Sequence, residues 1–365
     1  MPLTSRRLLA IIVSVLVLVA GTLPLAATAA TSEPYRIRRF DLAGDLRRNE
    51  LPWTNEERLG FPARKPRDED GVRLSLCDDG RKYYGPGSLA INALKRLDAY
   101  VEEGDARQLE MAEKHAAVLR RIAFRRGSAW FLPYRCDYLA AGQHAPWFNA
   151  MAQGLAVSLF VRLHQVTGEE RHLDAAWKVF RSFRRFDRSR RTWVSHVDGQ
   201  RYLWLEHYPL ARPDHVLNAH LHATFGLYEL WRETRSPRVR RVLEGAITTM
   251  RDHAWRYRRP GRVSLYGLRH REAIHKYHGI HVWQLRLLAR ISGDDWFWRL
   301  AARLVRDASP ARYVPGRPQI VRRPSAAFVP LAAGISWAWA PLSSGTGTLA
   351  RSVDSAQPER IGSSR

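Results

Sequence analysis

Four helical hairpins recur along the chain, and this repeat limits the fold more than any other feature. Apolar residues with a helical period lie on both sides of tight turns at Gly104, Gly168, Ser236 and Gly293. These positions are 64, 68 and 57 residues apart. A repeat of this size built from an α-hairpin is typical of a solenoid or a closed toroid. We therefore predict an all-α fold, an α/α toroid (barrel) of four hairpins.

The connections between hairpins are long, whereas the turns within them are short. The predicted helices pair as 86–103 with 108–124, 148–166 with 171–183, 216–233 with 239–255, and 280–291 with 294–307. Residues 127–147, 187–214 and 258–277 join the pairs and are rich in Tyr, Trp, His and Arg. Long loops with such a composition are usually functional. In a toroid they leave the helices at one end, opposite the tight turns, so we expect them to form one site. A VDGQ sequence in the middle loop predicts a short β-arm.

The two ends of the chain differ in composition from its middle. Arg6 and Arg7 precede an apolar run, and Ala27 and Ala29 follow in A-x-A spacing, the order of an export signal. An uncleaved anchor fits the same residues, which would allow membrane association. We expect an exported protein, extracellular or in the cell envelope. Its predicted segments are a signal or anchor (1–29), an extended segment (30–80), the catalytic toroid (81–308) and a basic Pro/Gly/Ser-rich tail (309–365).

Charge and cysteine content restrict the partners and the chemistry. The 365 residues carry a net charge of +24, which favours an acidic partner such as nucleic acid, an anionic membrane or an acidic polysaccharide. Most of this charge is arginine, as a GC-rich genome would also give, so charge alone does not decide. The only cysteines, Cys77 and Cys136, can form one disulfide after export. No nucleic-acid recognition motif accompanies the charge, and we expect no nucleic-acid partner.

Motifs for metal, cofactor and nucleophilic chemistry are missing from the sequence. His275, His278 and His281 are spaced by three residues, which differs from the zincin pattern, and we expect no metal. There is no nucleophile elbow, phosphate-binding loop or dinucleotide fingerprint, and we expect no cofactor. The tyrosines, histidines and arginines of the loops instead fit proton chemistry beside a bound carboxylate.

Four segments in order resemble the D-glucuronyl C5-epimerase family, whose members modify glucuronate in heparin and heparan sulfate precursors. The segments are DGVRLSLCDDGRKYYGP (70–86), PWFNAMAQGLAVSLFVRLHQVTG (146–168), WLEHYP followed by VLNAHLHATFGLYELW (204–231), and SLYGLRH followed by KYHGIHVWQLRLL (264–288). The catalytic domain of that family is an α/α barrel. The resemblance therefore implies an epimerase that inverts C5 of D-glucuronate-type residues in an acidic, uronate-containing polysaccharide.

The resemblance also implies roles for particular residues. Tyr208, Tyr266 and Tyr277 match active-site tyrosines, and Arg269 matches an arginine that faces the substrate carboxylate. A tyrosine can act as a base where positive charge lowers its pKa. Further substrate-binding candidates in the resembling segments are His278, Tyr84, Trp147, Gln153 and Asn218.

The family usually reads W-L-E-E-Y-P, and its second glutamate is assigned as a base. Here that position is His207, and imidazole is a competent base near neutral pH. Glu206 keeps the first glutamate and is expected either to orient His207 or to take part in catalysis. Lys276 stands where an aspartate is common in the family. Two other functions remain open: a lyase that cleaves uronate glycans by β-elimination, and a catalytically silent acidic-glycan binder. The sequence does not determine the oligomeric state.

Overall fold

The computed structural model describes residues 34–46, 51, 66–189 and 191–308. Contacts divide the chain into Met1–Pro34 and Tyr35–Arg365, and every element below belongs to the second unit. The predicted signal or anchor and the predicted tail lie outside the described residues. Within the described part, no helix has the length and apolar character needed to cross a bilayer.

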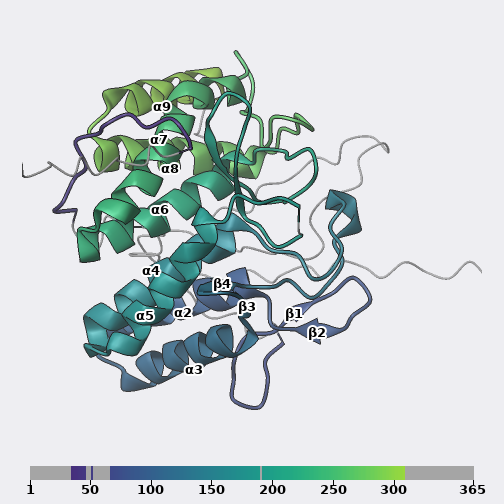
Figure 1. Cartoon of the computed structure of the whole chain (residues 1–365), viewed down its shortest axis with the longest axis vertical. Coiled ribbons are helices and arrows are strands. Elements are labelled where there is room, and N and C mark those ends of the chain that lie inside the picture. Colours follow the sequence, from purple (N-terminus) through teal and green to yellow (C-terminus); the bar gives the residue numbers. More distant parts are fainter. Residues whose placement is uncertain (1–33, 47–50, 52–65, 190, 309–365) are drawn as a thin grey trace, which may run out of the picture. The chain divides into compact units, whose positions relative to one another are not determined.

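The described part is mainly helical, as predicted (Figure 1). Its α-helices are α2 (Pro86–Glu103), α3 (Ala106–Ile122), α4 (Ala150–Thr167), α5 (Glu170–Phe180), α6 (Leu217–Thr234), α7 (Pro237–His253), α8 (His275–Ser292) and α9 (Asp295–Asp307). Its strands are β1 (Ser75–Leu76), β2 (Lys82–Tyr83), β3 (Phe124–Arg126), β4 (Ala129–Phe131), β5 (Ser195–Val197) and β6 (Leu203–Leu205). Short 3₁₀ helices are η2 (Leu139–Ala141), η3 (Arg181–Arg184) and η4 (Ala254–Tyr257). Each predicted helix is present, and α8 begins five residues before the predicted start at residue 280.

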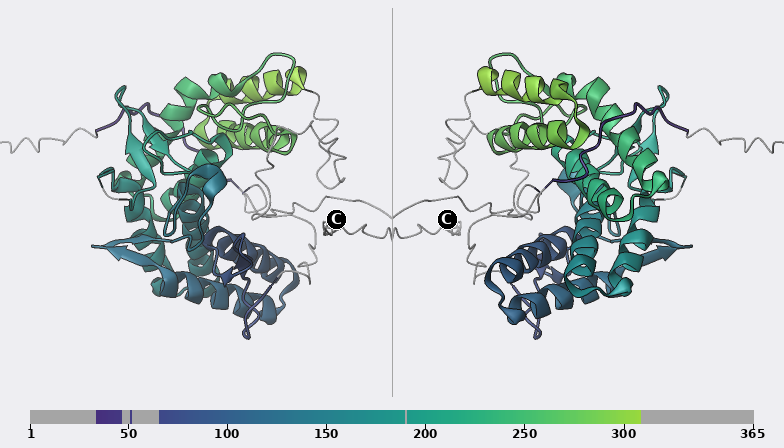
Figure 2. Two further views of the ribbon diagram at one scale, coloured as in Figure 1. Left: turned by 90° about the vertical axis from the view of Figure 1, so that its right-hand side faces the viewer. Right: turned by 90° about the vertical axis from the view of Figure 1, so that its left-hand side faces the viewer.

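The helices pack in the alternating order of an α/α toroid. Each of α2, α4, α6 and α8 packs on the helix that follows it in the chain, and these four also pack on one another in the order α2, α4, α6, α8. Figure 2 shows the four hairpins succeeding one another from blue to yellow-green. This order confirms the predicted fold class. We call α2, α4, α6 and α8 the inner helices. Among the described residues, α2 and α8 do not pack closely on each other, so the described ring of inner helices is open between them.

The inner helices are buried because they are apolar or small on almost every side. Fourteen of the eighteen residues of α4 are buried, whereas α9 buries one face only. Glycines allow α4 and α6 to approach closely. A Cβ atom at Gly226 would lie 2.2 Å from the carbonyl oxygen of Gly154, and one at Gly154 would lie 2.5 Å from the Cα of Ala223. Any side chain at either glycine would therefore push these central helices apart.

The tight turns have the conformation that ends helices. Gly104, Gly168 and Gly293 follow α2, α4 and α8 with φ of 73°, 72° and 67°, the left-handed region that glycine adopts readily. Arg235 ends α6 in the same region with φ 50°. The turn predicted at Ser236 therefore forms without a glycine.

Short antiparallel hairpins lie before α2 and within the connections. β5 pairs with β6 across the predicted VDGQ turn, which confirms the β-arm. Two further pairs, β1 with β2 and β3 with β4, were not predicted, because strands of two or three residues give little alternation to detect. The extended segment before residue 47 packs on the helices, with Tyr35 and Phe40 in the core.

Candidate active site

A pocket lies where the β1–β2 hairpin meets the three long loops. Its empty volume is about 730 Å³, counting the open mouth. The lining residues are Leu76, Cys77, Asp78, Tyr83, Tyr134, Cys136, Asp137, Tyr138, Trp147, His207, Tyr208, Tyr266, Ile274 and Tyr277. All three long connections thus contribute to one cavity, together with the segment around β1 and β2. This size and this mixture of aromatic and polar groups are common in small-molecule sites.

Four phenols form a connected group inside this pocket. The ring centroids of Tyr266 and Tyr277 lie 4.5 Å apart, and those of Tyr138 and Tyr208 lie 6.0 Å apart. Tyr266 hydrogen-bonds to Tyr208, and Tyr208 hydrogen-bonds to Tyr138. The pocket therefore presents a continuous chain of hydroxyl groups, which can donate hydrogen bonds to a sugar or carboxylate.

Burial keeps these phenols protonated. It raises the pKa of Tyr138 to about 12 and raises the pKa values of Tyr208 and Tyr266 well above the usual 10. Burial also raises the pKa of Tyr277, against a hydrogen bond from Tyr266 that lowers it. A tyrosine base would need a lowered pKa, and the structure gives the opposite direction. These tyrosines therefore stay protonated and can donate hydrogen bonds.

His207 is the imidazole of this pocket. It follows β6 and is only 5% exposed, and its ring centroid lies 4.4 Å from that of Tyr208. Its Nδ1 atom has no hydrogen-bond partner. Burial lowers the pKa of His207 to about 4, although the negative charge of Glu206 opposes this shift. The side chain is therefore an uncharged imidazole, and its buried Nδ1 atom lacks a partner.

Glu206 lies behind His207 and does not line the pocket. It is fully buried, and its Oε1 atom accepts a hydrogen bond from Nδ1 of His215 at 2.6 Å. Burial alone would raise the pKa of Glu206, but the charge and hydrogen bond of His215 and the charge of His196 outweigh burial and lower it. The expectation of a direct catalytic role, or of a bond that orients His207, is not met by this arrangement.

The third loop is held by Asp214, and this directs Arg269 away from the pocket. Oδ1 of Asp214 accepts hydrogen bonds from the backbone N–H groups of Arg269 at 2.9 Å and His270 at 2.8 Å. Gly267 permits this contact, because a Cβ there would lie 2.0 Å from Oδ2 of Asp214. Nη1 of Arg269 donates to the carbonyl of Arg212 at 2.6 Å. In this structure Arg269 is therefore absent from the lining, contrary to its expected carboxylate-facing position.

His278 and Tyr84 also lie outside the lining. Nδ1 of His278 accepts a hydrogen bond from the backbone N–H of Ser264 at 2.9 Å, and Nε2 contacts the carbonyl of Leu304 at 3.0 Å. Both ring nitrogens thus join α8 to neighbouring segments. The hydroxyl of Tyr84 donates to Asp68 at 2.8 Å. The observed contacts of both residues are structural, whereas substrate contact was expected.

Two of the remaining predicted residues are buried behind the pocket, and one lines it. Gln153 accepts a hydrogen bond from the N–H of Leu132 and donates to the carbonyl of Trp130, each at 2.8 Å, so it fixes the first loop to α4. Asn218 is buried near the start of α6 and is not among the lining residues. Trp147 lines the pocket, as its assignment to substrate binding requires.

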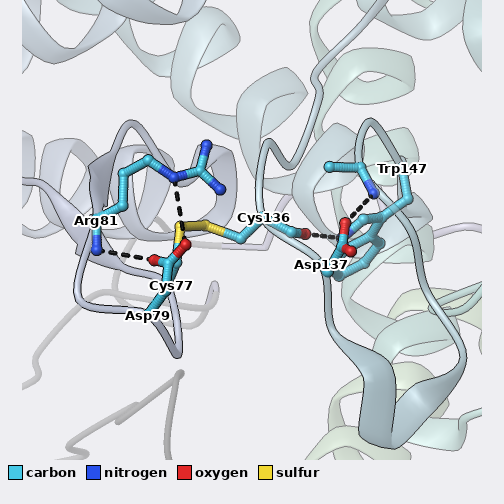
Figure 3. Close-up of a disulfide and its surroundings, with 7 residues drawn as sticks. Cys77, Asp79, Arg81, Cys136, Asp137 and Trp147 are labelled. Carbon is cyan, nitrogen blue, oxygen red and sulfur yellow. Dashed lines mark hydrogen bonds and ion pairs between the residues drawn. A yellow bond between two sulfur atoms is a disulfide. The ribbon is translucent and has the colours of Figure 1, made fainter.

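A disulfide forms part of the pocket wall (Figure 3). Cys77 and Cys136 are bonded, with their Cα atoms 5.6 Å apart. The indole N–H of Trp147 donates to the carbonyl of Cys136 at 2.9 Å, and its ring stacks on Tyr134 at 4.2 Å. The predicted disulfide therefore joins the hairpin before α2 to the first long loop, and it lies at the site itself.

Several lining residues were not among the site residues expected from the sequence. Asp78 and Asp137 each follow a cysteine, so the disulfide brings both acids to the pocket. Tyr134 and Tyr138 belong to the aromatic cluster of the first loop, which was the available signal. Among the described lining residues there is no arginine or lysine. One cation near the pocket is Lys276, whose Nζ lies 5.9 Å from the ring centroid of Tyr277. Another is Arg81, which lies beside the Cys77–Cys136 disulfide (Figure 3).

Known proteins are similar in sequence to the part of the chain that forms most of the pocket. Residues 126–305 match the family model described as D-glucuronyl C5-epimerase C-terminus. A D-glucuronyl C5-epimerase of Caenorhabditis elegans is 26% identical over 184 residues, which cover 44% of this chain and 28% of that protein. The matched region includes the three long loops and every pocket residue from Tyr134 onward.

Solved structures with a similar helical arrangement are more distant. A cellobiose 2-epimerase of Spirochaeta thermophila is 19% identical, with a TM-score of 0.48, and 69% of this chain and 67% of that chain are covered. A cellobiose 2-epimerase of Bacillus thermoamylovorans is 16% identical, with a TM-score of 0.48 and coverage of 71% and 70%. The similarity to known proteins rests on the sequence match, and residues 126–305 of this chain are similar to the D-glucuronyl C5-epimerase C-terminus family.

Proposed function

We propose that this protein is a carbohydrate epimerase that inverts C5 of D-glucuronate-type residues in an acidic polysaccharide outside the cytoplasm. One observation carries the proposal: an imidazole with an unpartnered nitrogen, His207, shares a pocket with the protonated phenols Tyr266 and Tyr277. The similarity of residues 126–305 to the D-glucuronyl C5-epimerase C-terminus family supports the choice of a uronate. The match covers only 28% of the length of the C. elegans relative. The choice of a uronate polymer as the substrate of this chain is therefore also proposed.

The chemistry needs a proton acceptor and a proton donor on opposite faces of a sugar ring. In the proposed step the C5–H bond breaks, its proton moves to the imidazole of His207, and its electron pair delocalises into the adjacent carboxylate. The phenols donate hydrogen bonds to the negative charge that develops there, which stabilises the transition state. Tyr277 then gives its hydroxyl proton to C5 from the other face. Solvent later reprotonates Tyr277 and takes the proton from His207.

We propose Lys276 as the cation that attracts the substrate carboxylate. It stands at the start of α8 beside Tyr277, whereas Arg269 is engaged with the backbone outside the pocket lining. A charged hydrogen bond is worth about 1.5–3 kcal/mol, so Lys276→Gln is expected to raise KM for a uronate polymer about tenfold or more. Arg269→Gln serves as the matched control and should change KM little. The reverse pattern in steady-state kinetics would assign the carboxylate to Arg269.

Product analysis distinguishes this function from its neighbours. We expect NMR spectra of a glucuronate-containing polymer treated with the protein to show signals of the C5-inverted uronate. A β-eliminating lyase would instead produce an unsaturated uronate with ultraviolet absorption. Binding without either product, measured with the same polymer, would identify a silent glycan binder. Either of these two results contradicts the proposal.

A further inference from the structure

Two histidines and a glutamate converge behind the pocket, and the proposed reaction uses none of them directly. His196 lies on β5, Glu206 follows β6, and His215 precedes α6. The Nδ1 atoms of His215 and His196 lie 2.6 Å and 3.7 Å from the same oxygen, Oε1 of Glu206. The ligand atoms of the three side chains all lie within 4.8 Å of one another. Three nearby segments of the chain thus direct two imidazole nitrogens and one carboxylate oxygen to one point.

One of these nitrogens lacks a hydrogen bond. His196 is 4% exposed, and its Nδ1 atom has no hydrogen-bond partner. Its 3.7 Å separation from Glu206 is too long for a hydrogen bond. Buried polar atoms usually have partners, so an orphaned nitrogen that points at a buried carboxylate calls for a ligand between them.

We propose that His196, Glu206 and His215 bind a divalent transition-metal ion, with zinc as the best match. Imidazole nitrogen and carboxylate oxygen are common zinc ligands, at about 2.0–2.2 Å from the ion. Two such ligands in tetrahedral geometry lie about 3.4 Å apart. The 3.7 Å separation of His196 and Glu206 is close to this value, and His215 would move from Glu206 by less than about 1 Å. The ion would replace the proton that His215 shares with Glu206.

The surroundings hold His215 in place for this role. Its backbone has φ 55°, a conformation that is uncommon for a residue with a side chain. Its ring stacks on Trp204 at 3.9 Å, and its carbonyl accepts a hydrogen bond from the hydroxyl of Tyr257 at 2.5 Å. Strained and fixed residues of this kind concentrate at ligand sites. The metal would tie the β-arm to the start of α6. Its ligand Glu206 directly precedes His207 in the chain.

A second group in the described residues, Glu113, Glu169 and His172, is a weaker candidate. It offers one imidazole and two partly exposed carboxylates. Arg171 already forms ion pairs with both of these carboxylates, so the local negative charge is compensated. This difference makes the group a matched internal control.

The test is zinc binding by the full-length protein, which is independent of any enzymatic activity. After dialysis against a chelator, the protein is titrated with zinc, and metal content is measured after gel filtration. We expect one zinc per chain and a higher melting temperature with zinc. His196→Asn and Glu206→Gln should lose the stoichiometric zinc, whereas His172→Asn should retain it.

Cobalt substitution keeps the proposal testable even if a variant unfolds. In the wild-type protein, Co²⁺ should give the visible absorption of a site with nitrogen and oxygen ligands, and zinc should displace it. The proposal is overturned if the wild-type protein retains less than a tenth of a zinc per chain. It is also overturned if His172→Asn removes the metal while His196→Asn, folded by circular dichroism, keeps it.

Discussion

Gly226→Ala is expected to destabilise the protein by about 4 kcal/mol or more, an exceptional effect for one methyl group. The new Cβ would lie 2.2 Å from the carbonyl oxygen of Gly154 and 2.8 Å from its Cα. These are backbone atoms of α4, so no side-chain rotation relieves the contact. The two central helices would have to separate, and close-packed cores tolerate such expansion poorly.

The measurement is denaturant unfolding of the variant beside a control with the same chemical change. Gly199→Ala adds a methyl group in the β5–β6 turn, where no atom lies within 4 Å of the new Cβ and φ is outside the left-handed region. It should leave the unfolding midpoint nearly unchanged. Equal midpoints for both variants would show that α4 and α6 do not cross as closely as described.

His207→Ala is expected to reduce hydrogen exchange at C5 of the substrate by about 10²–10⁴-fold, the usual contribution of a general base. The pocket contains no second imidazole among its described lining residues, and its phenols are protonated. His164→Ala is a suitable control, because that residue lies near the tight-turn end of α4 and outside the pocket lining.

Exchange is measured by mass spectrometry of a uronate polymer after incubation in deuterated water. Tyr277→Phe should prevent inversion, because the face opposite His207 loses its proton donor. Full exchange by the His207→Ala variant would place the base elsewhere, with Tyr208 the next pocket residue to test.

The helical part of the fold could be predicted because the local sequence marks where each helical hairpin begins and ends. Apolar period marks the helix faces, and glycines mark the ends of α2, α4 and α8. The early start of α8 was not predictable, because His275, Lys276 and Tyr277 look like loop residues until the tertiary structure orders them. The β1–β2 and β3–β4 pairs were missed because their strands are too short for a pattern.

The location of the candidate site could be predicted from the sequence, whereas several of its side-chain contacts could not. Aromatic loops between hairpins indicated one cavity, and His207, Tyr208, Tyr266 and Tyr277 all line it. Side-chain direction depends on distant partners that a motif does not contain. Arg269 is directed by Asp214, 55 residues away in sequence, so its exclusion from the lining could not be read from its motif.

The same limit applies to Glu206 and to the pocket acids. Glu206 adjoins His207 in sequence, but alternation along the chain places its side chain behind the pocket, bonded to His215. Asp78 enters the lining through the hairpin that the disulfide joins to the first loop. These positions follow from the folded chain rather than from local sequence.

The most direct test of the proposed function follows C5 of a glucuronate polymer in deuterated water with the unmodified protein. We expect that deuterium appears at C5 and that the same sugar residues acquire the inverted configuration, both detected by NMR. A polymer that binds to the protein but keeps all its C5 protons, across the available uronate glycans, would contradict the assignment of this pocket to epimerisation.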